Sequence, residues 1–224
     1  MISQDKGYLL SLSKYNENSA ITEFYTEIHG KISGILFGAV SKKIKNYLFV
    51  GNRFHLNFND KYNGKIGYFK IEIDKLYTPF FLENKKKLYC IIYAIHIVKL
   101  LTAYNQENRY IYKLIENFFN ILNDDDWIIK FIYWELELYK NLGYDINFKD
   151  YVKNIHDKGD EQFIVESTKK IIPKFLINKE SLPKNNVDLL NGFKIVGDYL
   201  DKSILKPNNI SYPISRIEFF NLIK

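Results

Sequence analysis

The hydrophobic pattern of the chain changes its period near Pro79, and this change divides the sequence into two kinds of structure. Before Pro79, apolar residues alternate with polar residues, as they do in half-buried β-strands. After Pro79, apolar residues recur at spacings of three and four, as they do in amphipathic helices. The early part holds five segments with the length and punctuation of strands, namely 7–14, 20–25, 31–37, 53–58 and 66–73.

Glycines lie in and between these strand-like segments, where a small barrel needs bulges and corners to curl and close. They are Gly30, Gly34, Gly38, Gly51, Gly64 and Gly67. We therefore predict an α+β protein that begins with a β-barrel over residues 1–78.

The remainder, residues 79–224, is predicted to be helical. The apolar spacing marks helices over 88–101, 111–122, 128–142, 187–200 and 214–223. Asp124 and Asp125 lie where a helix cap and first-turn acids belong, and Gly143 lies where a helix ends. Residues 147–185 are weakly patterned. Such a stretch can house a small sheet or a metal ribbon, but here it offers only His156 and scattered acids.

Composition limits the kind of protein. With 224 residues the chain can form one large or two small domains, and Cys90 is its only cysteine, which excludes an internal disulfide or a cysteine-based zinc site. No apolar run is long enough to cross a membrane, and residues 1–7 do not resemble a signal peptide. The single cysteine fits a reducing cytosol. The net charge of +6 favours an anionic partner, although AT-rich codons also favour lysine.

The strongest local charge feature is a segment without acids between Glu27 and Asp60. Its cations are predicted to neutralise the phosphates of a nucleic acid, and they are Lys31, Lys42, Lys43, Lys45 and Arg53. The alternative is that residues 42–45 form a solvated turn. Tyr47 and Phe49 lie close by and are candidates for stacking on single-stranded bases, although Phe49 also fits a core position.

No catalytic constellation is evident. The histidines are dispersed: His96 lies on an apolar helix and reads as a satisfied core residue, and His29 reads as part of a turn. Helix capping explains the acids at 124–126 better than a magnesium site does. The aromatic helix 127–139 fits the core better than it fits a groove for a partner peptide.

The first part of the chain carries a collinear series of short motifs: Gly7-Tyr-Leu-Leu, Glu17-Asn-Ser-Ala-Ile21, Phe24-Tyr-Thr-Glu-Ile-His-Gly30, Gly34, Gly38, Ser41-Lys-Lys and Gly51-Asn52. The series continues in Trp134-Glu-Leu-Glu-Leu138, in Leu142-Gly-Tyr-Asp-Ile146 and in the helix 188–200. In their order and spacing, these motifs resemble the RecO family of bacterial recombination mediators.

The resemblance implies an OB-fold followed by a helical domain, in a non-catalytic cytoplasmic, nucleoid-associated protein that needs no cofactor. It implies binding to single- and double-stranded DNA, annealing of complementary strands, and help in loading recombinase onto strands coated by single-strand-binding protein. The implied partners are RecR and the acidic-hydrophobic tail of the single-strand-binding protein.

Two features depart from the family pattern. Many members carry four zinc-binding cysteines after the Leu-Gly-Phe turn, and this chain has none of them, so a metal-free version is expected. The family's arginines in the basic loop are lysines here. Lysine keeps the charge but lacks the bidentate fork of arginine, so phosphate attraction should persist while ordered contacts weaken.

Two rival functions follow from the residues. The first is an interaction module whose helical part binds a partner peptide while the barrel is only a scaffold. The second is an enzyme whose site is assembled from dispersed residues such as His29, Asp60 and Glu72. The absence of any catalytic motif argues against the second.

Overall fold

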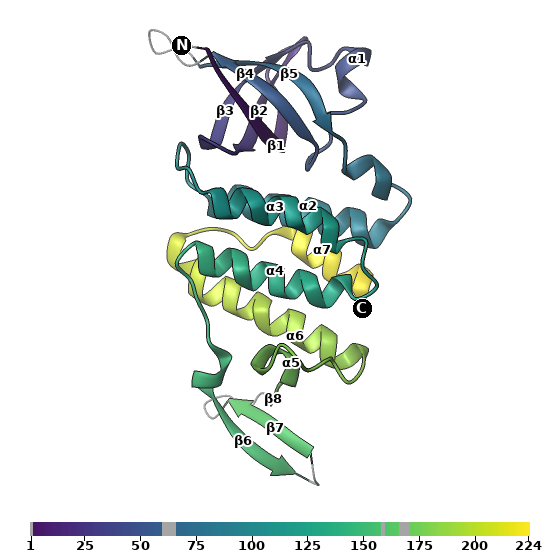
Figure 1. Cartoon of the computed structure of the whole chain (residues 1–224), viewed down its shortest axis with the longest axis vertical. Helices are drawn as coiled ribbons and strands as arrows, with labels where there is room; N and C mark the ends of the chain where they lie inside the picture. The colour runs from purple at the N-terminus through teal and green to yellow at the C-terminus, as the bar shows by residue number, and fades with distance from the viewer. Residues whose placement is uncertain (1, 60–65, 158–159, 166–170) are drawn as a thin grey trace. The chain divides into compact units, whose positions relative to one another are not determined.

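The computed structural model describes residues 2–59, 66–157, 160–165 and 171–224 (Figure 1). The chain forms two compact units: unit 1 comprises Met1–Asn123 and Pro213–Ile223, and unit 2 comprises Asp124–Tyr212 with Lys224. The expected domain boundary at residue 78 falls inside unit 1. The division into an OB-fold domain over 1–78 and a helical domain over 79–224 stays a prediction.

Unit 1 begins with a closed five-stranded barrel, which confirms the predicted architecture. Its strands are β1 (Ile2–Lys14), β2 (Ser19–Thr26), β3 (Gly30–Phe37), β4 (Arg53–Asn59) and β5 (Tyr68–Lys75). The order around the barrel is β1-β2-β3-β5-β4. All pairs are antiparallel except β3 and β5, which are parallel and join through Ile35↔Tyr68 and Leu36↔Phe69.

The barrel interior is filled by side chains that alternate along the strands. It contains Leu9, Ala20, Phe24, Ile32, Leu36, Ala39, Leu48, Phe54, Leu56 and Phe69. The ring of Phe24 meets the ring of Phe69 edge-on, with the centroids 5.0 Å apart. Because each of these strands buries one face inside the barrel, the alternation seen in the sequence sets which side chains point outward.

Glycine allows β3 and β5 to approach closely where the barrel closes. A Cβ on Gly34 would lie 2.8 Å from the Phe69 ring and 2.9 Å from the Gly67 carbonyl oxygen. A Cβ on Gly67 would lie 2.7 Å from both the Asn59 carbonyl and the Phe58 ring. The closing edge therefore requires these two small residues.

The turn after β2 uses several of the residues that carry the family resemblance. Thr26 Oγ1 donates to the Gly30 carbonyl and accepts from the His29 amide. The buried Asp5 carboxylate accepts from the amides of Ile28 and His29 and lies 2.7 Å from His29 Nδ1. His29 therefore supports a turn, as the sequence indicates.

A second turn of this kind precedes β4. Asn52 is fully buried, and its amide group donates to the Tyr47 carbonyl while its oxygen accepts from the amides of Tyr77 and Thr78. Gly51 has a φ of +87° and a Cβ there would meet the Phe119 ring at 2.9 Å. The Gly-Asn pair thus joins the barrel to the segment that follows it.

Three helical elements follow the barrel within unit 1: the 3-10 helix η1 (Thr78–Phe81), α2 (Lys85–Leu101) and α3 (Arg109–Ile121). Tyr8 points outward from β1 and packs among aromatic rings of these elements. Its ring centroid lies 5.3 Å from that of Tyr112 and 6.1 Å from that of Phe119, while Tyr77 stacks on Phe119 at 4.1 Å. The outer face of β1 is therefore part of the core.

A polar network also joins the barrel to α2. The Glu23 carboxylate accepts hydrogen bonds from Ser11 and Tyr104, and Lys99 Nζ lies 2.6 Å from Glu23 Oε2. Burial alone would raise the pKa of Glu23, but the hydrogen bonds from Lys99, Ser11 and Tyr104 outweigh it and the pKa is lowered. Glu23 is thus stabilised as an anion.

The last helix, α7 (Ile214–Ile223), belongs to unit 1 and packs against α2. Arg216 is 1% exposed, and its guanidinium donates to the Tyr93 hydroxyl at 3.1 Å. His96 Nδ1 lies 2.9 Å from the Ser215 hydroxyl, so His96 is the satisfied helix histidine that the sequence predicts.

Unit 2 is built on α4 (Trp127–Asn141) and α6 (Asn186–Tyr199). The aromatics Trp127, Phe131, Trp134 and Tyr139 of α4 are buried, which confirms their predicted core role. The predicted capping by Asp124 and Asp125 is wrong. Asp126 holds the cap position without a side-chain cap bond, and Asp124 and Asp126 instead pair with Lys130 at 2.7 and 2.8 Å. Gly143, at φ +88°, does end the helix.

The weakly patterned stretch of unit 2 contains a small sheet. Its strands are β6 (Val152–Asp157), β7 (Asp160–Val165) and β8 (Ile171–Ile172), in that order. The 3-10 helix η2 (Phe148–Tyr151) precedes them and the short α5 (Lys174–Ile177) follows. After α6, a π-helical turn (Leu200–Leu205) and the 3-10 helix η4 (Lys206–Asn208) complete the unit.

Gly30 offers a test of the close approach at the turn after β2. Its φ is +66°, and a Cβ would lie 1.9 Å from the Gln106 carbonyl oxygen. We expect Gly30→Ala to lower the free energy of unfolding by about 2–5 kcal/mol, because the new side chain would be strained in the left-handed region and would overlap with backbone.

Gly38→Ala is the matched control. Gly38 also has a positive φ, of +72°, but a Cβ there would meet only Ile44 Cδ1, at 3.9 Å. Gly38→Ala should lower the free energy of unfolding, measured for both variants by urea titration, by about 1–2 kcal/mol. Equal losses would contradict the steric argument.

The Glu23 network makes stability depend on pH. Because the pKa of folded Glu23 is lowered, its contribution is present above the unfolded pKa of about 4.3 and is lost as pH falls through the folded pKa. Glu23→Gln should therefore reduce the free energy of unfolding by about 1–3 kcal/mol near neutral pH. The difference from wild type should shrink in acid. Glu17→Gln, at an exposed turn, is the control and should change little. A pH-independent difference for Glu23→Gln would rule out the charge as its cause.

Candidate nucleic-acid interface

Three exposed cations of the barrel unit lie on a short helix between β3 and β4. The expected basic loop is wrong in its conformation: Lys42–Lys45 form one helical turn, α1, with Ser41 at its N-cap position. Lys42, Lys43 and Lys45 are all exposed. In the described part of the chain, no ion pair involves any of these three ammonium groups. Their charges are therefore available to an external anion.

Apolar contacts hold α1 on the barrel. Ile44 is half-buried against the barrel interior, and so is Tyr47, just after the helix. Phe49 is also half-buried. The expected stacking role of Tyr47 and Phe49 stays a prediction. Tyr47 packs against the barrel core, although the sequence analysis offered a core position for Phe49 only. The same packing fixes the base of the lysine-bearing turn.

Lys31 lies apart from this exposed group. It is 6% exposed, its ammonium group donates to the Lys99 carbonyl at 2.7 Å, and it lies 4.4 Å from the centre of the Tyr104 ring. Burial lowers the pKa of Lys31, although Glu23 acts in the opposite direction. The structure thus gives Lys31 a place in the packing of β3 on α2 and the segment after it.

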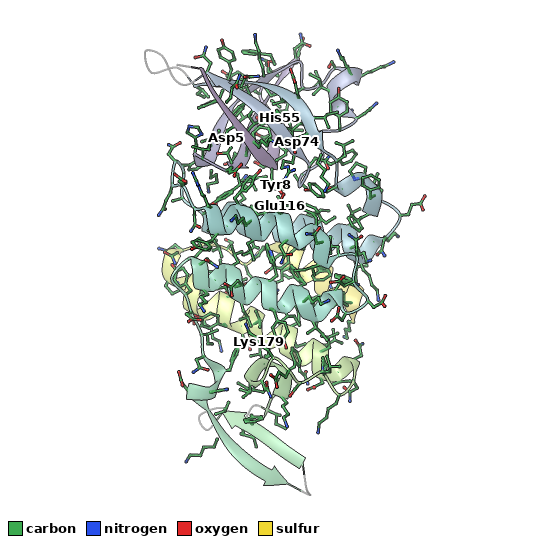
Figure 2. The ribbon with its side chains drawn as sticks, in the orientation of Figure 1. Asp5, Tyr8, His55, Asp74, Glu116 and Lys179 are labelled. Atoms are coloured by element: carbon green, nitrogen blue, oxygen red, sulfur yellow. The ribbon has the colours of Figure 1, made fainter. Side chains whose placement is uncertain are left out.

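Arg53 is likewise engaged inside unit 1. Its guanidinium lies 2.5 Å from an Asp74 oxygen and 2.6 Å from a Glu116 oxygen, and it donates to the Tyr8 hydroxyl at 3.2 Å. Burial opposes its charge, but the bonds to Asp74 and Glu116 raise the pKa of Arg53 above its usual value. Figure 2 shows Tyr8, Asp74 and Glu116 close together where the barrel meets α3.

Asp74 has further polar partners on the outer face of the barrel. Besides Arg53, Lys6 Nζ lies 3.4 Å and His55 Nε2 lies 3.0 Å from its carboxylate. Burial would raise the pKa of Asp74, but hydrogen bonds from Arg53 and Lys6 outweigh it and lower the pKa. Two carboxylates, Asp74 and Glu116, therefore compensate the Arg53 charge that the sequence analysis treats as uncompensated.

The structure also brings forward residues that the sequence analysis missed. Phe37, at the end of β3, is 58% exposed, and its ring lies 5.9 Å from that of Tyr68 at the start of β5. The residue type of Phe37 does not distinguish it from the phenylalanines of the barrel core. Its outward direction follows from strand alternation, because Leu36 points into the barrel.

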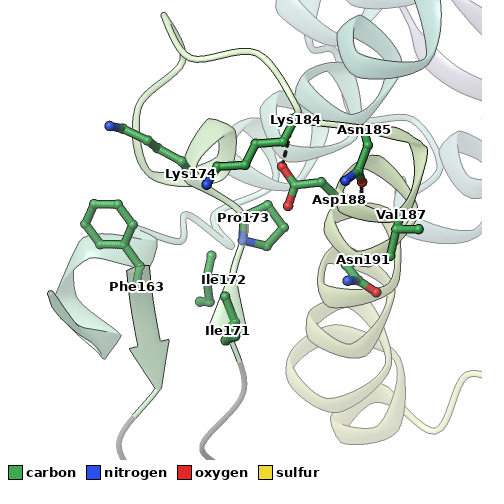
Figure 3. A pocket seen from close by; sticks show the side chains of 10 residues that line it. All are labelled: Phe163, Ile171, Ile172, Pro173, Lys174, Lys184, Asn185, Val187, Asp188 and Asn191. Carbon is green, nitrogen blue, oxygen red and sulfur yellow. Dashed lines mark hydrogen bonds between the residues drawn. The ribbon is translucent and has the colours of Figure 1, made fainter. Parts of the chain in front are cut away.

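Unit 2 contains a separate pocket of about 270 Å³ (Figure 3). Its apolar wall comes from β7, β8 and α6, and Lys174 and Lys184 lie on its rim. The lining residues are Phe163, Ile171, Ile172, Pro173, Lys174, Lys184, Asn185, Val187, Asp188 and Asn191. An apolar floor beside lysines suits a peptide that combines apolar and acidic groups.

The residues named for a dispersed enzyme site are not brought into a described cluster. Asp60 lies outside the described residues, His29 is bonded to Asp5, and Glu72 is exposed on β5. Within the described ranges, no group of three or more His, Cys, Asp or Glu side chains is placed to bind a metal ion. None of the helices described in the structure has the length and apolar character needed to span a bilayer.

Comparisons with known proteins agree with this architecture. The family model described as "Recombination protein O N terminal" matches residues 1–75, and the model "Recombination protein O C terminal" matches residues 82–180. The first match covers the barrel, and the second begins just after η1 and runs through α5.

Curated proteins named DNA repair protein RecO are similar over most of the chain. The one from Ehrlichia chaffeensis is 27% identical over 76% of this chain and 70% of its own length. The one from Bartonella quintana is 21% identical over 99% of this chain and 97% of its own length. The one from Rickettsia typhi is 26% identical over 80% of this chain and 81% of its own length. With an OB-like barrel followed by helices, and with both family models matched in order, this chain belongs to the RecO family of DNA repair proteins.

Proposed function

We propose that this protein binds single- and double-stranded DNA, anneals complementary strands, and helps to load recombinase onto strands coated by single-strand-binding protein. It does so without catalysis, in the cytoplasm at the nucleoid and together with RecR. The observation that carries the proposal is the exposed basic turn α1, whose three lysines have no ion-pair partner among the described residues of an OB-like barrel.

The proposed contact is mainly electrostatic. Lysine ammonium groups neutralise phosphates and release counterions, which favours binding without reading sequence. Because α1 carries lysines and no arginine, the contacts lack a bidentate geometry that would fix the strand in one orientation. Such contacts concentrate two complementary strands on one surface and screen their mutual repulsion, which is what annealing requires.

The structure reduces the number of phosphate contacts that we propose. Five cations would give a salt slope of about −3.5 at about −0.7 per phosphate of a single strand. Lys31 and Arg53 are engaged inside unit 1, so we assign the phosphate contacts to Lys42, Lys43 and Lys45. These three contribute a slope of about −2.

Replacing all three α1 lysines by Ala tests this assignment. We expect the variant to lose about two units from the slope of log affinity against log salt, measured with a fluorescent single-stranded oligonucleotide. Binding should also weaken at low salt. The rate at which complementary strands anneal should fall in parallel, since the same contacts bring the strands together.

A matched control distinguishes a local site from net charge. Lys85, Lys86 and Lys87 at the start of α2 can be replaced by Ala with the same loss of charge in the same unit. This control should leave the salt slope nearly unchanged. If both triple variants lose the same slope, the effect is one of total charge; if the α1 variant binds as wild type does, its lysines form a solvated turn.

A second candidate function is peptide recognition by unit 2, which the pocket in Figure 3 favours. Val187 is 65% exposed beside the pocket, and Ile171 is 54% exposed on β8. We propose that this pocket receives the acidic-hydrophobic tail of the single-strand-binding protein. Its apolar side chains would cover Val187 and Ile171, and its carboxylates would face Lys174 and Lys184.

Val187→Asp tests the pocket, because a carboxylate at its edge should repel an acidic peptide. We expect a loss of at least about tenfold in the affinity for a labelled tail peptide, or about 1.4 kcal/mol. Leu182→Asp is the control, since Leu182 is 73% exposed in the same unit but does not line the pocket. Equal peptide affinity in wild type and Val187→Asp would place the tail elsewhere.

A further inference from the structure

The outer surface of the barrel carries an aromatic pair beside α1, in which Phe37 is exposed and Tyr68 is half-buried. Phe37 and Tyr68 lie on neighbouring strands, with ring centroids 5.9 Å apart and ring planes at 56°. Phe37 is 58% exposed, so its ring is accessible to a ligand. Phe37 directly precedes Gly38, where the chain turns towards α1.

The backbone holds this pair in place. Ile35 pairs with Tyr68 across the closing edge of the barrel, and the Ile35 amide donates to the Gly67 carbonyl at 2.9 Å. Gly34 and Gly67 allow that close approach. On the other side of Phe37, β3 is paired to β2 through Ser19↔Phe37. The Phe37 ring therefore projects from a fixed backbone rather than from a loop.

Polar groups continue the surface around the pair. The Tyr68 hydroxyl accepts from Asn59 Nδ2 at 2.8 Å, which orients the phenol ring. Asn57 and Lys70 face each other in register on the adjoining positions of β4 and β5, and Lys70 is exposed. Phe37, Tyr68 and Asn59 thus form a row across β3, β5 and β4, with the next row carrying an amide and an ammonium group.

The basic turn borders this row. Ile44 Cδ1 of α1 lies 3.9 Å from the Cβ position of Gly38, so α1 packs on the residue next to Phe37. Cations at this border can attract phosphates while an exposed ring beside them meets the attached bases. Aromatic rings next to a cationic track are the arrangement by which proteins bind single strands without sequence preference.

We propose that Phe37, supported by Tyr68, is a stacking platform for an unpaired base of a DNA strand whose phosphates lie along α1. This inference rests on the proposed function and adds a preference for single strands, because only an unstacked base can lie on the ring. The adjoining Asn57, Asn59 and Lys70 offer polar contacts to the same nucleotide or its neighbour.

Phe37→Ala tests the platform. Its affinity for a labelled single-stranded oligonucleotide should fall by about fivefold to 150-fold, which corresponds to about 1–3 kcal/mol per stacked base. The salt slope should not change, because no phosphate contact is lost. An oligonucleotide of the same length with abasic sites should bind wild type and variant equally. Phe37→Trp should restore the affinity, since the indole ring can stack.

Phe80→Ala is the matched control, because Phe80 is 81% exposed on η1 in the same unit and does not belong to the row across β3, β5 and β4. It should bind as wild type does. If wild type binds the single strand but Phe37→Ala binds equally well, the platform is wrong while DNA binding stands. If wild type binds no oligonucleotide at any salt concentration, the proposed function fails and the platform fails with it.

Discussion

The burial of one side of the barrel against α2 and α3 determines where the rest of this protein can act. In an isolated barrel, the outward residues of β1 and β2 would be open to a ligand. Here they pack against the helices. Tyr8 lies among Tyr112 and Phe119, and Glu23 pairs with Lys99. The outer surface left for a ligand is therefore that of β4, β5 and the end of β3, next to α1. Charge and exposed aromatic surface are found there together.

The sequence predicted the architecture well because its signals are local. Alternation within five short segments and helical spacing after Pro79 depend on neighbours a few residues away, and both patterns were recovered in the structure. The turns at Thr26 to Gly30 and at Gly51-Asn52 were also foreseeable, since each needs particular residue types. By contrast, the sheet of β6, β7 and β8 arises in weakly patterned sequence. There, strand pairing rather than composition decides the structure.

The candidate site was harder to predict because its charges are decided by partners distant in sequence. Between Glu27 and Asp60 no acid is present, yet Arg53 meets Asp74 from β5 and Glu116 from α3. Lys31 is buried by the segment that contains Tyr104. A run of cations in the sequence therefore does not show whether distant carboxylates neutralise them in the fold. The lysines of α1 differ because, in the described part of the chain, no ion pair engages their ammonium groups.

The proposed interface combines two contacts with different physical consequences. Ammonium groups attract phosphates over distance but hardly orient a strand, whereas a stacked ring acts only at contact and holds a base face. On this barrel the rings present a surface row rather than an enclosed cleft, because the interior is filled by side chains such as Phe24 and Phe69. A base stacked on such a surface keeps its pairing edge open to solvent. A second, complementary strand could then pair with it without first displacing the protein, and this suits annealing better than tight storage of a single strand.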